Sequence, residues 1–131
     1  MPITAFFAAL LAGLYIVLSA RVIVYRRAQK VEIGEGGDRE LLRRIRVHAN
    51  FIEYTPIFLI LLGLAESLAV PRTFLLVLGS AFCIGRLLHA YALSQTPHIL
   101  NLRVAGMVLS LLAIIGAAVQ CLIHALARGL L

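Results

Sequence analysis

Four long runs of apolar residues, separated by three short polar stretches, make up almost the whole chain. Each run is close to the ~20 residues that an α-helix needs to cross the hydrocarbon core of a bilayer. The second run begins with an amphipathic part, in which Leu41, Ile45 and Ala49 recur at helical spacing. The pattern predicts four transmembrane helices, over about residues 3–24, 39–70, 73–93 and 102–126.

The stretches between these helices are short and contain turn-forming residues. Glycines and acidic residues fill the first stretch, and Asp38 at its end is a plausible N-cap for the second helix. Pro71 and Arg72 leave room for only a tight turn, and Pro97 interrupts the helical pattern before the fourth helix. Short connections make neighbouring helices antiparallel. We therefore expect residues 1–131 to form a single antiparallel four-helix bundle.

Two residues of the second helix stand out from its apolar background. Pro56 cannot donate a backbone hydrogen bond, so it should kink the helix or free the carbonyl of Ile52 one turn earlier. Glu66 lies near the end of the helix, where water can reach it. We interpret Glu66 as a carboxylate at the membrane interface.

The composition assigns the bundle to a membrane. The chain is 62% hydrophobic and 14% charged, with a mean hydropathy of +0.99. Soluble domains contain roughly 45–50% apolar and about 25% charged residues. No charged residue precedes Arg21, whereas a cleaved signal peptide has its basic residues before the apolar run. The first run is therefore interpreted as a retained transmembrane helix.

The net charge of +6 is concentrated at one end of the predicted bundle. The opposite end carries only Arg72 and Arg128. This asymmetry is typical of positive loops retained in the cytoplasm and in contact with anionic lipid headgroups, not of a nucleic-acid-binding protein. It predicts that both termini lie outside, on the side of the membrane away from the cytoplasm. The basic residues of the first loop and its flanks are Arg21, Arg26, Arg27, Lys30, Arg39, Arg43, Arg44 and Arg46.

Polar side chains on the second helix form a stripe near this basic end. Arg46, Asn50 and Glu53 follow one another at offsets of four and seven residues, and Tyr54 borders them. Ionisable residues are costly in a bilayer and usually face a bundle interior or a wet cavity. The stripe is therefore a candidate binding site.

Further polar residues on the third and fourth helices are expected at the same depth. Arg86 lies inside the inner half of the third helix, His89 follows on nearly the same face, and Tyr91 lies on a flank. Arg103 begins the fourth helix. Glu53 is the only acidic residue in the inner half of any predicted helix, so we expect it to interact with Arg86.

Several kinds of chemistry do not fit these residues. The chain has no Ser-His-Asp set, no HExxH motif and no metal-ligand spacing. A haem held by two of His48, His89 and His124 is disfavoured, because His124 is predicted on the other side of the membrane. Cys83 and Cys121 lie inside apolar runs and are interpreted as packing residues.

What remains suits a small zwitterion with more than one carboxylate. Arginines hold carboxylates through paired, charge-assisted hydrogen bonds, and a glutamate can hold an ammonium group. A spare arginine can also stabilise a thiolate, because nearby positive charge lowers a thiol pKa.

The segment RVHANFIEYTPIFL, together with GRLLHAY at residues 85–91, resembles the signature of the MAPEG family, the membrane-associated proteins of eicosanoid and glutathione metabolism. The resemblance covers essentially the whole chain, and the chain is most similar to small bacterial members of the family, which are inner-membrane proteins. It implies a homotrimer with glutathione sites between subunits, and a transferase or peroxidase acting on lipophilic electrophiles. By this resemblance Arg103 stabilises the thiolate, and the glutathione-binding residues are Arg46, Asn50, Glu53, Tyr54, Arg86, His89 and Tyr91.

Two other functions compete with this one. The family has a non-catalytic branch, so a lipid-binding or scaffold protein is the alternative. A small multidrug exporter would need a glutamate in the first helix, and this chain has none there.

Overall fold

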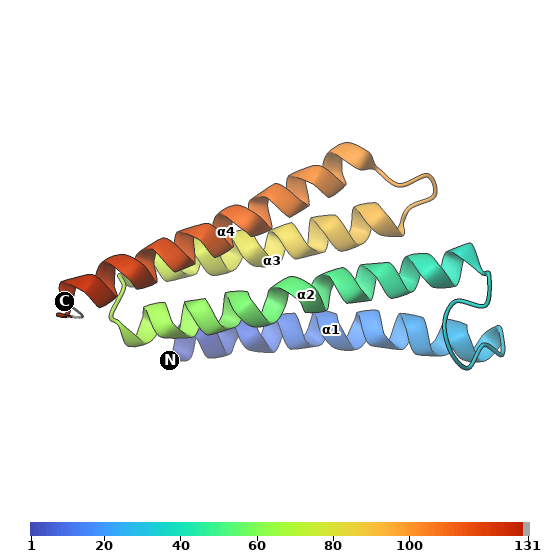
Figure 1. Cartoon of the computed structure of the whole chain (residues 1–131), viewed down its shortest axis with the longest axis horizontal. Coiled ribbons are helices and arrows are strands. Elements are labelled where there is room, and N and C mark those ends of the chain that lie inside the picture. The colour runs from blue at the N-terminus through green and yellow to red at the C-terminus, as the bar shows by residue number, and fades with distance from the viewer. Residues whose placement is uncertain (130–131) are drawn as a thin grey trace.

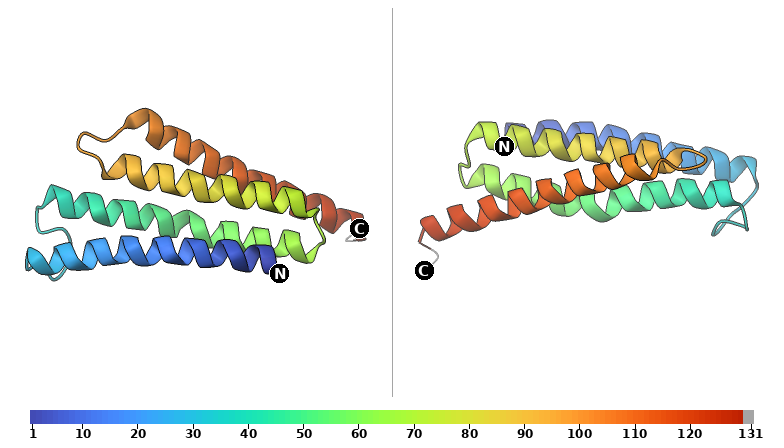
Figure 2. Two further views of the ribbon diagram at one scale, coloured as in Figure 1. Left: turned by 180° about the vertical axis from the view of Figure 1, so that it is seen from behind. Right: turned by 90° about the horizontal axis from the view of Figure 1, so that it is seen from above.

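The computed structural model describes residues 1–129, and it confirms an all-α architecture suited to a membrane (Figure 1). Each helix is long and apolar enough to cross a bilayer. Consecutive helices run antiparallel, so the start of α1 and the end of α4 lie at the same end of the bundle (Figures 1 and 2). The helices are α1 (Pro2–Ala28), α2 (Arg39–Ser67), α3 (Arg72–Ser94) and α4 (Leu100–Ala127).

Helices α2 and α3 form the centre of the bundle. Each packs against all three other helices, whereas α1 and α4 make no contact with each other within residues 1–129. Figure 1 shows the α3–α4 hairpin rising away from the α1–α2 hairpin toward the end where residues 29–38 lie. We call the end with residues 29–38 the basic end, and the end where α1 begins and α4 ends the opposite end.

The core toward the opposite end is made of closely stacked aromatic rings. Phe58 of α2 and Phe82 of α3 are fully buried, and their ring centroids lie 4.0 Å apart in nearly parallel planes. Phe7 of α1 fills the space over Gly79 of α3, where a Cβ atom would come within 2.1 Å of the ring. This apolar packing fixes α1, α2 and α3 against one another.

Helices α3 and α4 cross at two glycines. A Cβ atom on Gly106 would lie 2.7 Å from the backbone oxygen of Gly85 and 2.7 Å from the backbone nitrogen of His89. Small residues allow such close backbone approach in lipid, where apolar burial alone does not drive helices together. The crossing determines how deeply the side chains of α4 reach toward α3.

Carboxylates close the first turns of two helices. Asp38 is the predicted N-cap of α2, and its Oδ1 accepts hydrogen bonds from the backbone N–H groups of Glu40 at 2.8 Å and Leu41 at 3.1 Å. Glu66, expected only to meet water at the interface, accepts hydrogen bonds from the N–H groups of Ile3 at 3.0 Å and Thr4 at 2.8 Å. Its side chain therefore caps α1 from the end of α2, because Met1 provides no side-chain cap.

Helix α2 continues through Pro56. The proline has no N–H group, so the carbonyl of Ile52 loses its helical partner. One residue earlier along the chain, Thr55 Oγ1 donates to the carbonyl oxygen of Phe51 at 2.7 Å.

Arginine side chains join the two hairpins at the basic end. Arg21 of α1 donates to Ser94 Oγ of α3 at 3.0 Å, and Arg43 of α2 donates to Thr96 Oγ1 in the connection to α4. These contacts add to the apolar packing that holds the hairpins together toward the opposite end.

Candidate functional site

A buried arginine lies between α2, α3 and α4. Arg86 is only 2% exposed. Its Nε donates to Ser110 Oγ at 2.8 Å, its Nη1 donates to Asn50 Oδ1 at 2.8 Å, and its Nη2 lies 3.7 Å from Met107 Sδ. The guanidinium also lies 5.1 Å from the centre of the Tyr54 ring. Neutral groups from two neighbouring helices therefore position the charge.

No carboxylate compensates this charge among the described residues, where the only ion pairs join Glu40 to Arg43 and Arg44. The expected interaction with Glu53 is absent: Glu53 is exposed, and Arg86 donates to Asn50 instead. Burial of a charge in a low-dielectric region is costly unless the charge is paired. The site therefore has excess positive charge and favours an anion.

A cavity of about 250 Å³ adjoins Arg86. Asn50 and Met107 belong to the cavity wall and also contact the guanidinium, so the cavity and the buried charge form one site. Two further arginines line the cavity, one from α2 and one from α4. The lining residues are Arg46, Asn50, His89, Leu93, Arg103 and Met107.

The backbone crossing of α3 and α4 brings this wall together. Gly106 packs against the backbone of His89, and Arg103 precedes Gly106 by about one helical turn. His89 is 4% exposed and lines the cavity. The close approach at Gly106 therefore places Arg103 at the same cavity as His89.

Six of the eight predicted site residues are found in this site. Arg46, Asn50, His89 and Arg103 line the cavity, Arg86 lies against it, and the Tyr54 ring faces Arg86. Glu53 and Tyr91 do not join them in the single chain. Tyr91 is 57% exposed, and neither residue lines the cavity.

Sequence reasoning missed Ser110 and Met107, which both contact Arg86. Ser110 is fully buried and also donates to the carbonyl oxygen of Gly106 at 2.8 Å. Ser110 lies among other small residues of α4, and a serine in such a run carries no sign of a charged partner. Within residues 1–129, no cluster of His, Cys, Asp and Glu could hold a metal ion.

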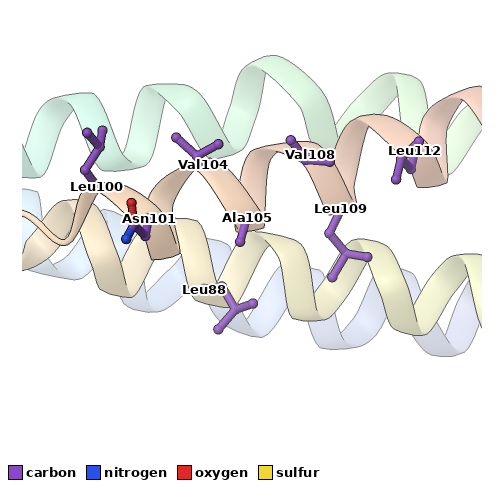
Figure 3. Close-up of a pocket in the computed structure, with 8 residues that line it drawn as sticks. All are labelled: Leu88, Leu100, Asn101, Val104, Ala105, Val108, Leu109 and Leu112. Carbon is purple, nitrogen blue, oxygen red and sulfur yellow. The ribbon is translucent and has the colours of Figure 1, made fainter.

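A large hollow lies on the outer surface of α4 and α3 (Figure 3). Its volume is about 620 Å³, and Asn101 is its only polar lining residue. An apolar surface of this kind is suited to lipid hydrocarbon and offers no group for acid–base or nucleophilic chemistry. The other lining residues are Leu88, Leu100, Val104, Ala105, Val108, Leu109 and Leu112.

Comparisons with known proteins agree with this architecture. The model of the MAPEG family matches residues 4–123. Two relatives, each named Inner membrane protein YecN, come from Escherichia coli K12 and from Escherichia coli O6:H1 strain CFT073. Each is 34% identical over 89 residues, which cover 68% of this chain and 68% of the relative.

Proposed function

The chain belongs to the MAPEG family, and from this premise we propose that it is a membrane-embedded glutathione-dependent transferase or peroxidase acting on lipophilic electrophiles. One observation carries the proposal. The cavity lined by Arg46 and Arg103 adjoins the buried Arg86, and no carboxylate compensates this charge in the described chain. Glutathione is an anion with two carboxylates and a thiol, and it provides the negative charge that such a site lacks.

The arginines have separate roles in this proposal. Arg46 binds a carboxylate of glutathione, because a guanidinium and a carboxylate form paired, charge-assisted hydrogen bonds. Arg86, held by Asn50 and Ser110, provides fixed positive potential behind the cavity. Arg103 stabilises the thiolate, since a nearby positive charge lowers the thiol pKa.

In the transferase reaction the thiol proton passes to water and the thiolate sulfur attacks an electrophilic carbon. A C–S bond forms. In a substitution the bond from this carbon to the leaving group breaks and its electron pair departs with the leaving group, whereas in an addition a π bond breaks and the atom that receives its electron pair takes a proton from water. In the peroxidase reaction two glutathione molecules reduce one hydroperoxide to an alcohol and water, and they leave as the disulfide. Both reactions use the same activated thiolate.

A homotrimer would complete the site. Small-molecule pockets usually measure roughly 300–1,000 Å³, so the cavity of about 250 Å³ in the single chain is small for a tripeptide. Glu53 and Tyr91 are exposed near this cavity, and a charged side chain at membrane depth needs a partner. A neighbouring subunit that covers these residues would add a wall, and Glu53 would bind the glutathione ammonium group.

Glutathione titration of the detergent-purified protein tests the proposal. We expect saturable binding by calorimetry and an ultraviolet absorbance signal from the bound thiolate. Arg103→Ala should remove the thiolate signal and retain binding, whereas Arg46→Ala and Glu53→Gln should abolish binding in an intact trimer. Arg72→Ala, an exposed arginine at the opposite end, is the matched control. Absence of binding at about millimolar glutathione, a Kd equivalent to only ~4 kcal/mol, would refute the proposal.

The alternative is a non-catalytic lipid-binding or scaffold protein, and the apolar hollow of about 620 Å³ on α4 favours it. It predicts lipid that co-purifies on this surface and no effect of Arg103→Ala on any thiol signal. For either function we propose an inner-membrane location with both termini periplasmic, as the basic end indicates. Reporter fusions at the two termini, one active only in the periplasm and one only in the cytoplasm, test this orientation.

A further inference from the structure

A second charged pocket lies at the basic end, remote from Arg86. The last turn of α1 and the residues after it border an open pocket of about 280 Å³. The pocket is lined by Arg26, Arg27, Lys30, Val31 and Glu32. Three cations and one carboxylate give its lining a net charge of +2, which favours an anion.

The backbone at this pocket is fixed by a hydrogen-bonded helix end. The N–H of Lys30 donates to the carbonyl oxygen of Arg27 at 3.2 Å, and the N–H of Val31 donates to that of Arg26 at 3.1 Å. These bonds form a Schellman motif, in which the residue in the position of Lys30 is usually glycine. Lys30 adopts a φ of 56°, in the left-handed region that costs free energy for residues with a Cβ atom. The turn holds a cation where glycine would be less strained.

The acidic groups at this end leave the pocket cations without ion pairs. Glu40 binds Arg43 and Arg44, and Asp38 caps α2. Arg26 Nη1 donates to the backbone oxygen of Glu32 at 3.2 Å, which orders its side chain without neutralising it. Across the described residues, Arg27 and Lys30 form no ion pair.

The pocket lies where a lipid headgroup would be. It ends the long apolar helix α1, at the level where a membrane span meets water. Ile23 and Val24 are exposed one turn before Arg26 and Arg27, on the same side of the helix. A lipid with its anionic headgroup in the pocket could therefore place its acyl chain along α1, whereas a free anion would contact only the charged residues of the pocket.

We propose that this pocket binds the phosphate headgroup of an anionic phospholipid, with an acyl chain along Ile23 and Val24. Arg27 and Lys30 contact the phosphate, and Arg26 is positioned beside them by Glu32. The net charge of the lining selects a lipid with a net negative charge over a zwitterionic lipid. This site does not depend on the glutathione proposal, because it shares no residue with the cavity at Arg86.

The test is native mass spectrometry of the full-length protein released from nanodiscs that contain equal amounts of phosphatidylglycerol and phosphatidylethanolamine. We expect retained phosphatidylglycerol in the unmodified protein. Each basic residue near a membrane surface adds to the attraction for anionic lipid, so removal of one should weaken retention about fivefold. The double variant Arg27→Gln with Lys30→Gln should weaken it about 25-fold. Arg39→Gln is the matched control, because Arg39 is an exposed arginine at the same end outside the pocket.

Lys30→Gly separates the charge from the structure of the turn. It should reduce lipid retention while leaving thermal stability at least equal, because glycine adopts the left-handed conformation without strain. Ala69→Gly relieves the same strain at the end of α2, where Ala69 has a φ of 59°, and should leave lipid retention unchanged.

Four results would overturn the proposal. The first is equal retention of the two lipids, and the second is an equal loss of retention in Arg27→Gln and Arg39→Gln. The third is unchanged retention in Lys30→Gly. The last is displacement of the bound lipid by millimolar inorganic phosphate, which would show that the acyl chain adds nothing to binding. The second result would indicate a diffuse surface potential, and the last a site for free phosphate.

Discussion

Arg86 and Asn50 meet at 2.8 Å between α3 and α2, and the acceptor that Asn50 offers is a neutral amide oxygen. A carboxylate in the same position would neutralise the guanidinium inside the protein. The amide orients the guanidinium and leaves its charge available to a bound anion. The identity of this one side chain therefore determines whether the charge of Arg86 is satisfied internally or by a ligand.

Asn50→Asp should convert the site from ligand-binding to self-compensated. We expect glutathione affinity to fall at least tenfold, which corresponds to about 1.4 kcal/mol, while thermal stability in detergent is retained or raised. Calorimetry and a thermal unfolding assay measure the two quantities. Asn101→Asp, the same chemical change on the exposed surface of α4, should leave binding unchanged. Unaltered glutathione binding in Asn50→Asp would contradict the role given to Arg86.

Gly106→Ala should separate α3 from α4. The new Cβ atom would meet backbone atoms of Gly85 and His89, which cannot rotate away as a side chain can. Overpacking of this kind costs about 1–3 kcal/mol, and it should also displace Arg103 from the cavity. Thermal unfolding and glutathione titration provide the measurements. The control is Gly13→Ala in α1, where no atom lies within 4 Å of the new Cβ. Similar stability of the two variants would show that the crossing tolerates a methyl group.

Glu66→Ala should loosen the first turn of α1. Two backbone N–H groups and the Thr4 hydroxyl, which donates to Glu66 Oε2 at 2.6 Å, would lose their acceptor. Loss of a helix cap costs about 0.5–2 kcal/mol, and hydrogen exchange should increase at Ile3 and Thr4. Ser67→Ala, at the neighbouring exposed position, should change stability by less than about 0.5 kcal/mol. Unchanged exchange in Glu66→Ala would show that the cap adds nothing to the helix end.

Asp38 should make stability depend on pH in the acid range, below a pH of about 4. The hydrogen bond from the Leu41 N–H is the largest cause that holds the pKa of Asp38 below its ordinary value, with further contributions from Glu40 and Tyr25. Because the folded pKa lies below the unfolded one, the stabilisation is complete above the unfolded value of about 3.9 and is lost as pH falls through the folded pKa.

Asp38→Asn is the variant that isolates this effect. Asparagine caps a helix about as well but does not titrate, so the variant should lose the Asp38 part of the acid dependence while the helix end stays capped. Unfolding midpoints measured from neutral pH down to acid give the comparison. Parallel curves for the two proteins would assign the acid dependence to other carboxylates.

The positions of the helices follow from the sequence, because apolar runs of membrane length leave little choice in lipid. Asp38 was predictable for a similar reason, since a capping side chain acts within its own turn. Glu66 caps a helix more than sixty residues away along the chain. No local pattern encodes a pairing of that kind.

The site was predicted as a face of α2 but not as a set of contacts. Spacing puts Arg46, Asn50 and Glu53 on one stripe, yet Glu53 is rotated from Asn50 by about 60° around the helix axis. Only the edge with Asn50 and Tyr54 meets α3, so Glu53 is left exposed and Arg86 bonds to the amide. Periodicity identifies a polar face, but the packing of α3 on α2 decides which edge of it is covered.

The two hairpins of the bundle are linked by the chain at the opposite end only. They are joined through the short connection between α2 and α3 and by the stacked rings of Phe58 and Phe82, while the cavity lies toward the basic end. Because the cavity lies farther from this connection than the rings do, a small change in the angle between the hairpins would change the width of the cavity more than the spacing of the rings. The contacts made by Arg21 and Arg43 lie farther from this connection than the cavity does, so they limit the separation of the hairpins and thereby the width of the site.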